Sequence, residues 1–329
     1  MGKRYNHLKL EERDTITVMK SEGKTLSEIA GVLGRDKGTI SRELQRNSSP
    51  EYKLYLSHRA QGRAEQRKGD ACQRLRLKDE RTVSYVRSKL SEGWSPEQIS
   101  GRIGIDHRGL SISHEAIYQY IYDANTTDRK ELIDHLRRAH RKRKQKGIAR
   151  KTHKTKIPNR ISIEERPTSV EIRHQFGHWE GDSLVSRKST VALNSLVERK
   201  SRLLMLTKLK RKSMDATSEA VVARLQGLPD KARRTLTMDN GTENAGHEKI
   251  TMEIGIKCYF AHPYASWERG TNENINGLVR WYLPKGTDFS NISCRQIAQI
   301  ESLINNRPRK CLGFKTPIEV ASPFVALQG

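Results

Sequence analysis

Cysteine and long apolar stretches are both scarce in this 329-residue sequence. The four cysteines lie far apart and form no CxxC pair, which argues against a zinc knuckle or a disulfide framework and favours a reducing compartment. No apolar run approaches the ~18 residues of a membrane-spanning helix. The polar N-terminus is unlike a signal peptide. These absences predict a soluble, intracellular protein.

Acidic residues are outnumbered: 62 Lys and Arg stand against 38 Asp and Glu, a net charge of +24. Residues 1–163 carry 37 basic and 20 acidic side chains, and therefore +17 of that excess. Residues 137–160 hold 12 Lys and Arg, among them Arg141 and Arg143, and no acid. Such a run stays extended until it meets phosphate, so we expect it to follow a DNA backbone without reading bases.

Residues 8–46 show three helical patterns separated by tight turns. Thr25 and Glu28 form a predicted capping box, and Gly34 is placed to end that second helix. A third helix over about 37–46 buries Ile40 and Leu44. The arrangement is typical of a helix-turn-helix, with an ordinary three-helix bundle as the alternative. Its candidate DNA contacts are Arg35, Lys37, Thr39, Ser41, Arg42 and Arg46.

A weaker second copy of this pattern follows. Residues 80–91 are helical in pattern, Ser95 and Pro96 open the next helix, and Gly104 is placed at its turn. Ser113 then caps a helix with the sequence HEAIYQYIY, in which we expect Tyr118 and Tyr122 to be core residues. The candidate DNA contacts here are His114, Gln119 and Tyr120.

From about residue 172 the pattern changes to alternating strands and helices. It predicts strands at 177–186, 190–198, 202–209, 234–239 and 256–260, helices at 213–226 and 244–254, and a long helical segment from about residue 266. A meander followed by alternating helix and strand indicates an α/β domain.

Three acids stand out in this domain. Asp182 lies in the first predicted strand, Asp239 ends the fourth, and Glu273 lies in the last helical segment. If the first and fourth strands are neighbours, the two aspartates emerge side by side and the helix brings Glu273 over them. A cluster of carboxylates suits Mg²⁺ or Mn²⁺, and two such ions can hold the attacking and leaving oxygens of a phosphodiester.

The strings around these acids carry a resemblance. GHWEGD, TMDNGTEN and AHPYASWERGTNENINGLVRWYLPKG resemble the catalytic blocks of DDE transposases of the insertion-sequence-thirty family. The N-terminal segment LKLEERDTITVMKSEGKTLSEIAGVLGRDKGTISRELQRN and the tail LINNRPRKCLGFKTPIEV resemble the same family.

The resemblance implies a multidomain chain with all-α helix-turn-helix domains and an α/β, RNase H-like (retroviral-integrase-like) catalytic domain. We expect two helix-turn-helix domains at 1–56 and 57–136, a basic linker at 137–170 and the catalytic domain at 171–329. The resemblance further implies catalytic metal ligands Asp182, Asp239 and Glu273 holding two Mg²⁺ ions, with Mn²⁺ as a substitute. The implied partners are double-stranded DNA (inverted repeats and target) and further copies of the chain, in the bacterial cytosol at the nucleoid.

Several roles stay open at this level. Asn240 and Glu243 either position metal-bound water or shape the turn, and Glu268 is a rival third ligand. His262 touches the scissile phosphate or is structural, and Trp267 stacks on a base or packs in the core. Arg280 and Lys285 are further candidate phosphate contacts. The competing functions are a DNA-binding regulator that retains only the readers and a plain structure-selective nuclease.

Overall fold

The computed structural model describes residues 7–49, 54–72, 77, 79–123, 126, 128–136, 157–263 and 265–325. The chain divides into two compact units, residues 1–76 and 77–329. Most of the basic run at 137–160, including Arg141 and Arg143, lies outside the described residues. In the part that is described, no helix is long and apolar enough to cross a membrane.

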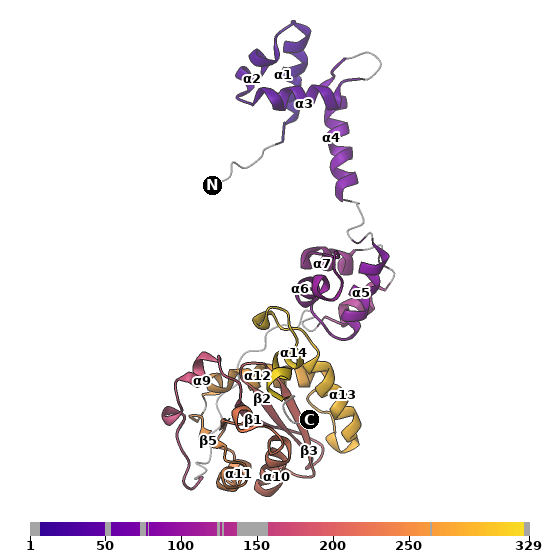
Figure 1. The fold of residues 1–329 in the computed structure, drawn as a ribbon. Helices are drawn as coiled ribbons and strands as arrows, with labels where there is room; N and C mark the ends of the chain where they lie inside the picture. Colours follow the sequence, from indigo (N-terminus) through magenta and orange to yellow (C-terminus); the bar gives the residue numbers. More distant parts are fainter. Residues whose placement is uncertain are drawn as a thin grey trace. The chain divides into compact units, whose positions relative to one another are not determined.

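The first unit is a bundle of four helices (Figure 1): α1 (Leu10–Ser21), α2 (Leu26–Leu33), α3 (Lys37–Asn47) and α4 (Ser57–Cys72). The predicted capping box opens α2, where the Thr25 side chain accepts from the Glu28 N–H and Glu28 accepts from the Thr25 N–H. Gly34 ends α2 in the left-handed conformation, at φ 61°. Ile16, Ile29 and Ile40, one from each of the first three helices, are fully buried together. Both predicted helix signals in this region are therefore confirmed.

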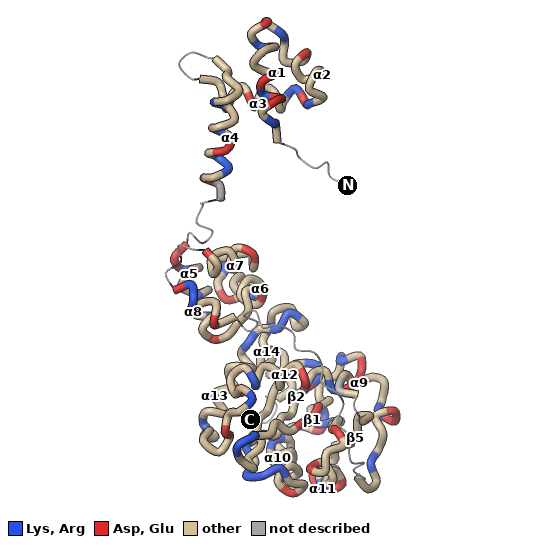
Figure 2. The backbone as a smooth tube through the Cα atoms, turned by 180° about the vertical axis from the view of Figure 1, so that it is seen from behind, with Lys and Arg blue, Asp and Glu red and all other residues tan. Residues whose placement is uncertain are grey.

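Helix α4 packs on the first three helices. Ala60 is fully buried in their core, and the Arg63 guanidinium donates to the Asn47 carbonyl at the end of α3. Figure 2 shows both basic and acidic residues along this helix. The domain boundary predicted after residue 56 falls just before α4, although α4 packs on the helices that precede it.

The second unit begins with α5 (Glu80–Ser91), α6 (Pro96–Asp106), α7 (His114–Tyr122) and α8 (Arg129–Asp134). Ser95 and Ser113 cap α6 and α7 as predicted. Gly104 lies inside α6 instead of at its turn, because α6 continues to Asp106 and ends with His107 in extended conformation. Tyr118 is half-buried, whereas Tyr122 is 40% exposed, so the expectation that Tyr122 is a core residue is wrong.

The remainder of the second unit is built on one five-stranded sheet of order β3-β2-β1-β4-β5. Strands β1 (His178–Val185), β2 (Ala192–Glu198) and β3 (Leu204–Leu209) form an antiparallel meander, and β4 (Thr235–Met238) and β5 (Lys257–Phe260) continue the sheet in parallel with β1. The first and fourth strands are neighbours, which is the condition for the two aspartates to meet. This is the RNase H-like arrangement that the resemblance implied.

Helices cover both faces of the sheet (Figure 1). One face buries Trp179, Leu236 and Met238 with residues of α10 (Met214–Leu225) and α11 (His247–Ile254). The other packs Leu184 and Leu193 against α12 (Gly270–Tyr282) and α13 (Cys294–Asn305). The chain also forms α9 (Ser169–Ile172), α14 (Pro317–Val325) and short 3-10 helices at Ile163–Glu165, Asp230–Ala232, Thr242–Asn244, Ser266–Arg269, Phe289–Asn291 and Lys310–Leu312.

Helix α6 contacts the C-terminal segment of the chain. The Arg102 guanidinium donates to both carboxylate oxygens of Glu319, over 2.7 and 2.6 Å. The Phe314 ring packs on Gly101 so closely that a Cβ there would lie 2.4–2.5 Å from ring carbons. A glycine at position 101 is thus what allows this contact.

Candidate active site

The register of the sheet places two of the predicted acids side by side. Strands β1 and β4 pair with His178 opposite Thr235 and Glu180 opposite Thr237, an offset of 57 residues. Asp182 and Asp239 are separated by the same 57 residues, so the register, continued past the last paired residues, sets them opposite each other. Because alternate residues of a strand point to the same face, Glu180 and Asp182 share the face that α12 covers.

One arginine joins the two aspartates. Arg269, immediately before α12, has Nη1 3.4 Å from Asp182 Oδ1 and Nη2 3.4 Å from Asp239 Oδ2. Nη1 also donates to the Gly181 carbonyl over 3.1 Å. Burial raises the pKa of Asp182, the Arg269 guanidinium opposes that shift, and the Asp239 carboxylate adds to it. The site therefore sets two repelling carboxylates around one cation. Arg269 was not anticipated, because no local pattern sets it apart from the other basic side chains.

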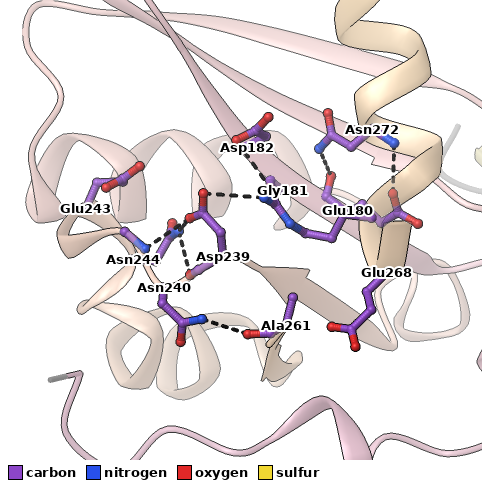
Figure 3. A network of polar contacts seen from close by, with 12 residues as sticks. Glu180, Gly181, Asp182, Asp239, Asn240, Glu243, Asn244, Ala261, Glu268 and Asn272 are labelled. Atoms are coloured by element: carbon purple, nitrogen blue, oxygen red, sulfur yellow. Dashed lines mark hydrogen bonds and ion pairs between the residues drawn. The ribbon is translucent and has the colours of Figure 1, made fainter. Parts of the chain in front are cut away.

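The turn after β4 fixes the Asp239 carboxylate. Its Oδ1 accepts from the Asn244 side-chain amide over 2.7 Å and from the Gly241 N–H over 3.1 Å (Figure 3). Asn240 donates to the Ala261 carbonyl, and the buried Glu243 pairs with Lys212. Asn240 and Glu243 hold the turn through these contacts, and a role toward metal-bound water stays a prediction. Asn244, which the sequence reasoning missed, contacts the acid directly.

The start of α12 is anchored to β1 by a buried carboxylate. Glu180 is fully buried, and its Oε2 accepts from the Asn272 N–H over 2.8 Å (Figure 3). Its Oε1 accepts from Arg199 over 2.9 Å. The Asn272 side chain donates to the Glu180 carbonyl over 2.9 Å and accepts from the Ser195 hydroxyl over 3.2 Å. These contacts fix the first turn of the helix that carries Glu273.

Further along α12, Asn276 donates to Asp182 Oδ2 over 2.7 Å. Glu273 lies three residues earlier, and residues three apart are neighbours on a helix surface. Its side chain is exposed and makes no hydrogen bond or ion pair among the described residues. The described part of the chain contains no group of three His, Cys, Asp or Glu side chains that could hold a metal ion. The structure thus brings Asp182 and Asp239 together, while the set of three acids stays a prediction.

The neighbouring His262 and Glu268 bind each other. Glu268 accepts from the His262 N–H over 2.8 Å, and its other oxygen lies 2.7 Å from His262 Nδ1. This hydrogen bond raises the pKa of His262. Trp267 is 76% exposed, so the core alternative for Trp267 is wrong. On β1, His178 and Trp179 are buried and structural, with Trp179 Nε1 donating to the Ala232 carbonyl.

The predicted DNA contacts fall into three groups. The exposed residues on α3 are Lys37, Ser41, Arg42 and Arg46, and Thr39 is half-buried. Arg35, just before α3, pairs with Glu12 over 2.8 Å. On α7, His114 and Gln119 are exposed. In the third group, Arg280 donates to the Val185 carbonyl over 3.0 Å and lies over the Phe289 ring, whereas Lys285 is exposed.

Comparison with known proteins identifies the helical domain at the start of the chain. Residues 4–47 match a family model described as a helix-turn-helix domain. The catalytic core domain of BIV integrase is 20% identical and covers 44% of this chain and 91% of its own, with a TM-score of 0.34. The HTLV-2 integrase catalytic core domain in complex with magnesium is also 20% identical, covering 44% of this chain and 96% of its own, with a TM-score of 0.34.

Curated relatives align over nearly the whole chain. The transposase for insertion sequence element IS1086 of Cupriavidus metallidurans is 37% identical over 98% of this chain and 96% of its own. The transposase InsI for insertion sequence element IS30A of Escherichia coli K12 is 38% identical over 98% of this chain and 85% of its own. The transposase for element IS4351 of Bacteroides fragilis is 36% identical over 95% and 94%. With that similarity along its length, a helix-turn-helix at its start and an RNase H-like core, the chain belongs to the IS30 family of insertion-sequence transposases.

Proposed function

We propose that the chain cuts DNA at the terminal inverted repeats of an insertion sequence and transfers the freed ends to target DNA. In this proposal Asp182, Asp239 and Glu273 form one catalytic set. The observation that carries it is the meeting of Asp182 and Asp239 at a single guanidinium, 3.4 Å from each carboxylate. Two carboxylates from neighbouring strands that converge on one cation form an electrostatic environment suited to divalent metal.

The donor chemistry fits Mg²⁺ or Mn²⁺. Both aspartates are partly accessible, with side-chain exposures of 29% and 36%, and both offer hard oxygen ligands. When bound, two such ions would neutralise charge on the phosphodiester and supply a nucleophile at neutral pH. Arg269 holds the carboxylates together in the conformation described, and we expect it to move away when both coordinate metal.

The third ligand is proposed from the placement of α12. Glu180 and Asn272 hold the first turn of the helix against β1, and Asn276 bonds the Asp182 carboxylate. Glu273, one turn before Asn276, has no competing partner among the described residues. The rival Glu268 is already bonded to His262 through both carboxylate oxygens. This difference favours Glu273.

DNA recognition is assigned to the helical domains. The exposed side chains of α3 provide the first reader, and α7 provides a second. Trp267, which is 76% exposed beside Glu268, is suited to stack on an unpaired base. Transposition requires two ends held together, so we further propose that the chain acts on double-stranded DNA as a homodimer or higher assembly, in the bacterial cytosol.

The test is strand cutting on a supercoiled plasmid that carries the element ends, with Mg²⁺ present. Wild-type protein is expected to nick the ends and join the products. Asp182→Asn and Glu273→Gln are expected to bind the ends normally and cut nothing, because positioning and charge neutralisation at the phosphodiester are removed.

Glu268→Gln is the matched control and is expected to keep measurable cutting. Specific binding by wild-type protein without any nicking would favour the DNA-binding regulator. Nicking without end joining would favour a plain nuclease. Loss of cutting in E268Q but not in E273Q would move the third ligand to position 268.

A further inference from the structure

A pocket of about 270 Å³ opens beside the first turn of α12 and is lined by three arginines. Arg173 follows α9, Arg202 lies in the turn between β2 and β3, and Arg309 precedes the 3-10 helix at Lys310–Leu312. Gly270 and Thr271 line it from the helix itself, as does Asn274, the residue after Glu273. Three separate segments therefore deliver guanidinium groups to one place next to the catalytic helix.

Two arginines of this pocket carry charge that no carboxylate neutralises directly. Neither Arg173 nor Arg202 forms an ion pair with a carboxylate anywhere in the described ranges, and Arg202 donates instead to the Thr271 hydroxyl over 3.0 Å. Partial burial, and then the nearby Arg202 and Arg199 guanidiniums, lower the pKa of Arg173. Arg199 itself is neutralised by Glu180 and Glu171. An anion entering the pocket would relieve the repulsion between these arginines.

Backbone conformation marks the same two arginines. Arg173 has φ 58° and Arg202 has φ 66°, two of only four non-glycine residues with positive φ among those described. Arg173 occupies the position after a helix where glycine is the usual residue, and Arg202 occupies a tight hairpin turn. At both places the chain carries an arginine where glycine would fit with less strain, and strain of this kind gathers at functional sites.

We propose that the arginine pocket binds a backbone phosphate of the DNA substrate, close to the scissile position. Guanidinium groups recognise phosphate through paired N–H donors, and the N-terminal turn of α12 adds its positive dipole end. The pocket thereby holds the strand beside the helix that carries Glu273. This inference rests on the proposed function, because it takes DNA as the ligand.

The strained conformation supplies an unusually clean test. Arg173→Gly and Arg202→Gly each remove a charge while placing glycine where glycine is favoured, so folding is expected to be preserved. Binding of the full-length chain to a duplex carrying the element end, and to an unrelated duplex of equal length, is measured across a salt series without divalent ions. Asn159→Gly, at φ 50°, controls for glycine at such a position, and Lys249→Gln on α11 controls for removal of one exposed charge.

The double variant R173G/R202G is expected to bind both duplexes more weakly. Its slope of log K against log salt should fall by about 0.9, equally on the two sequences, because the variant neutralises one phosphate fewer. Its melting temperature should match or exceed that of wild type. An unchanged slope, or weaker binding confined to the element end, would overturn the proposal. So would a fall in melting temperature beyond that of the controls, because the arginines would then be structural.

Omitting divalent ions separates this test from that of the proposed function. If wild-type protein fails to nick DNA with Mg²⁺ yet the salt slope falls in the double variant, the phosphate pocket stands and the catalytic proposal fails. If wild-type protein nicks normally and the slope does not change, the pocket proposal alone fails.

Discussion

Replacing Glu180 with alanine tests how the sheet positions α12, the helix that carries Glu273. The carboxylate is fully buried, and its removal leaves Arg199, itself 2% exposed, with one ion-pair partner instead of two and the Asn272 N–H without its acceptor. Breaking a buried ion pair from one side costs about 3–5 kcal/mol. For a unit of this size each kcal/mol lowers the melting temperature by roughly 2–4 °C, so Glu180→Ala should melt roughly 6–20 °C below wild type.

Glu180→Gln separates the charge from the shape of the side chain. The amide oxygen can still accept from Asn272, so the cost should be smaller, about 1.5–3 kcal/mol for weakening a charged hydrogen bond. Calorimetric or spectroscopic melting of the full-length chain measures both variants. Glu253→Ala, in an exposed pair with Lys249 at 3.9 Å, is the control and should cost less than about 1 kcal/mol. If the melting temperature of Glu180→Ala falls no further than that of Glu253→Ala, the contacts of Glu180 are not what holds α12 in place.

Three further predictions concern the helical parts of the chain. Arg42→Ala should weaken binding to the element end by about 1–3 kcal/mol if Arg42 reads a base edge, and an equal weakening on random DNA in the same binding assay would make it a phosphate contact. Thr25→Ala should destabilise the first unit by about 1 kcal/mol in a denaturant titration because the α2 cap is removed, and no change would show that the cap is dispensable. Arg102 lowers the pKa of Glu319 to about 2 from 4.5, so the stability from this pair is present above about pH 4.5 and lost as pH falls toward 2. Arg102→Ala should therefore reduce the loss of melting temperature between about pH 4.5 and 2. A melting temperature that depends on pH as in wild type would contradict the assignment.

The sheet was predictable from the sequence because its strands are short apolar segments bounded by turn residues. The five predicted strands agree with β1 to β5 to within two residues at each end. The pairing of β1 with β4 entered only as a condition, since two aspartates 57 residues apart meet only if those strands are neighbours. The register that places them opposite each other is a property of the folded sheet and was not available from either strand alone.

What the sequence did not reveal are contacts between distant segments. Arg269 reaches two aspartates, 87 and 30 residues away in the chain, and no local pattern distinguishes it from 61 other basic side chains. The membership of α4 in the first unit depends on the burial of Ala60, a small residue in an otherwise polar helix. The strain at Arg173 and Arg202 likewise exists only in the folded backbone.

The central claim is that Asp182, Asp239 and Glu273 share divalent metal, and the most direct measurement is anomalous diffraction from crystals of the chain with end DNA and Mn²⁺. The account predicts manganese peaks bonded to oxygens of all three side chains, with Arg269 withdrawn from between the aspartates. Peaks coordinated by Glu268 in place of Glu273, or no manganese at the aspartates while Arg269 keeps its position, would contradict it.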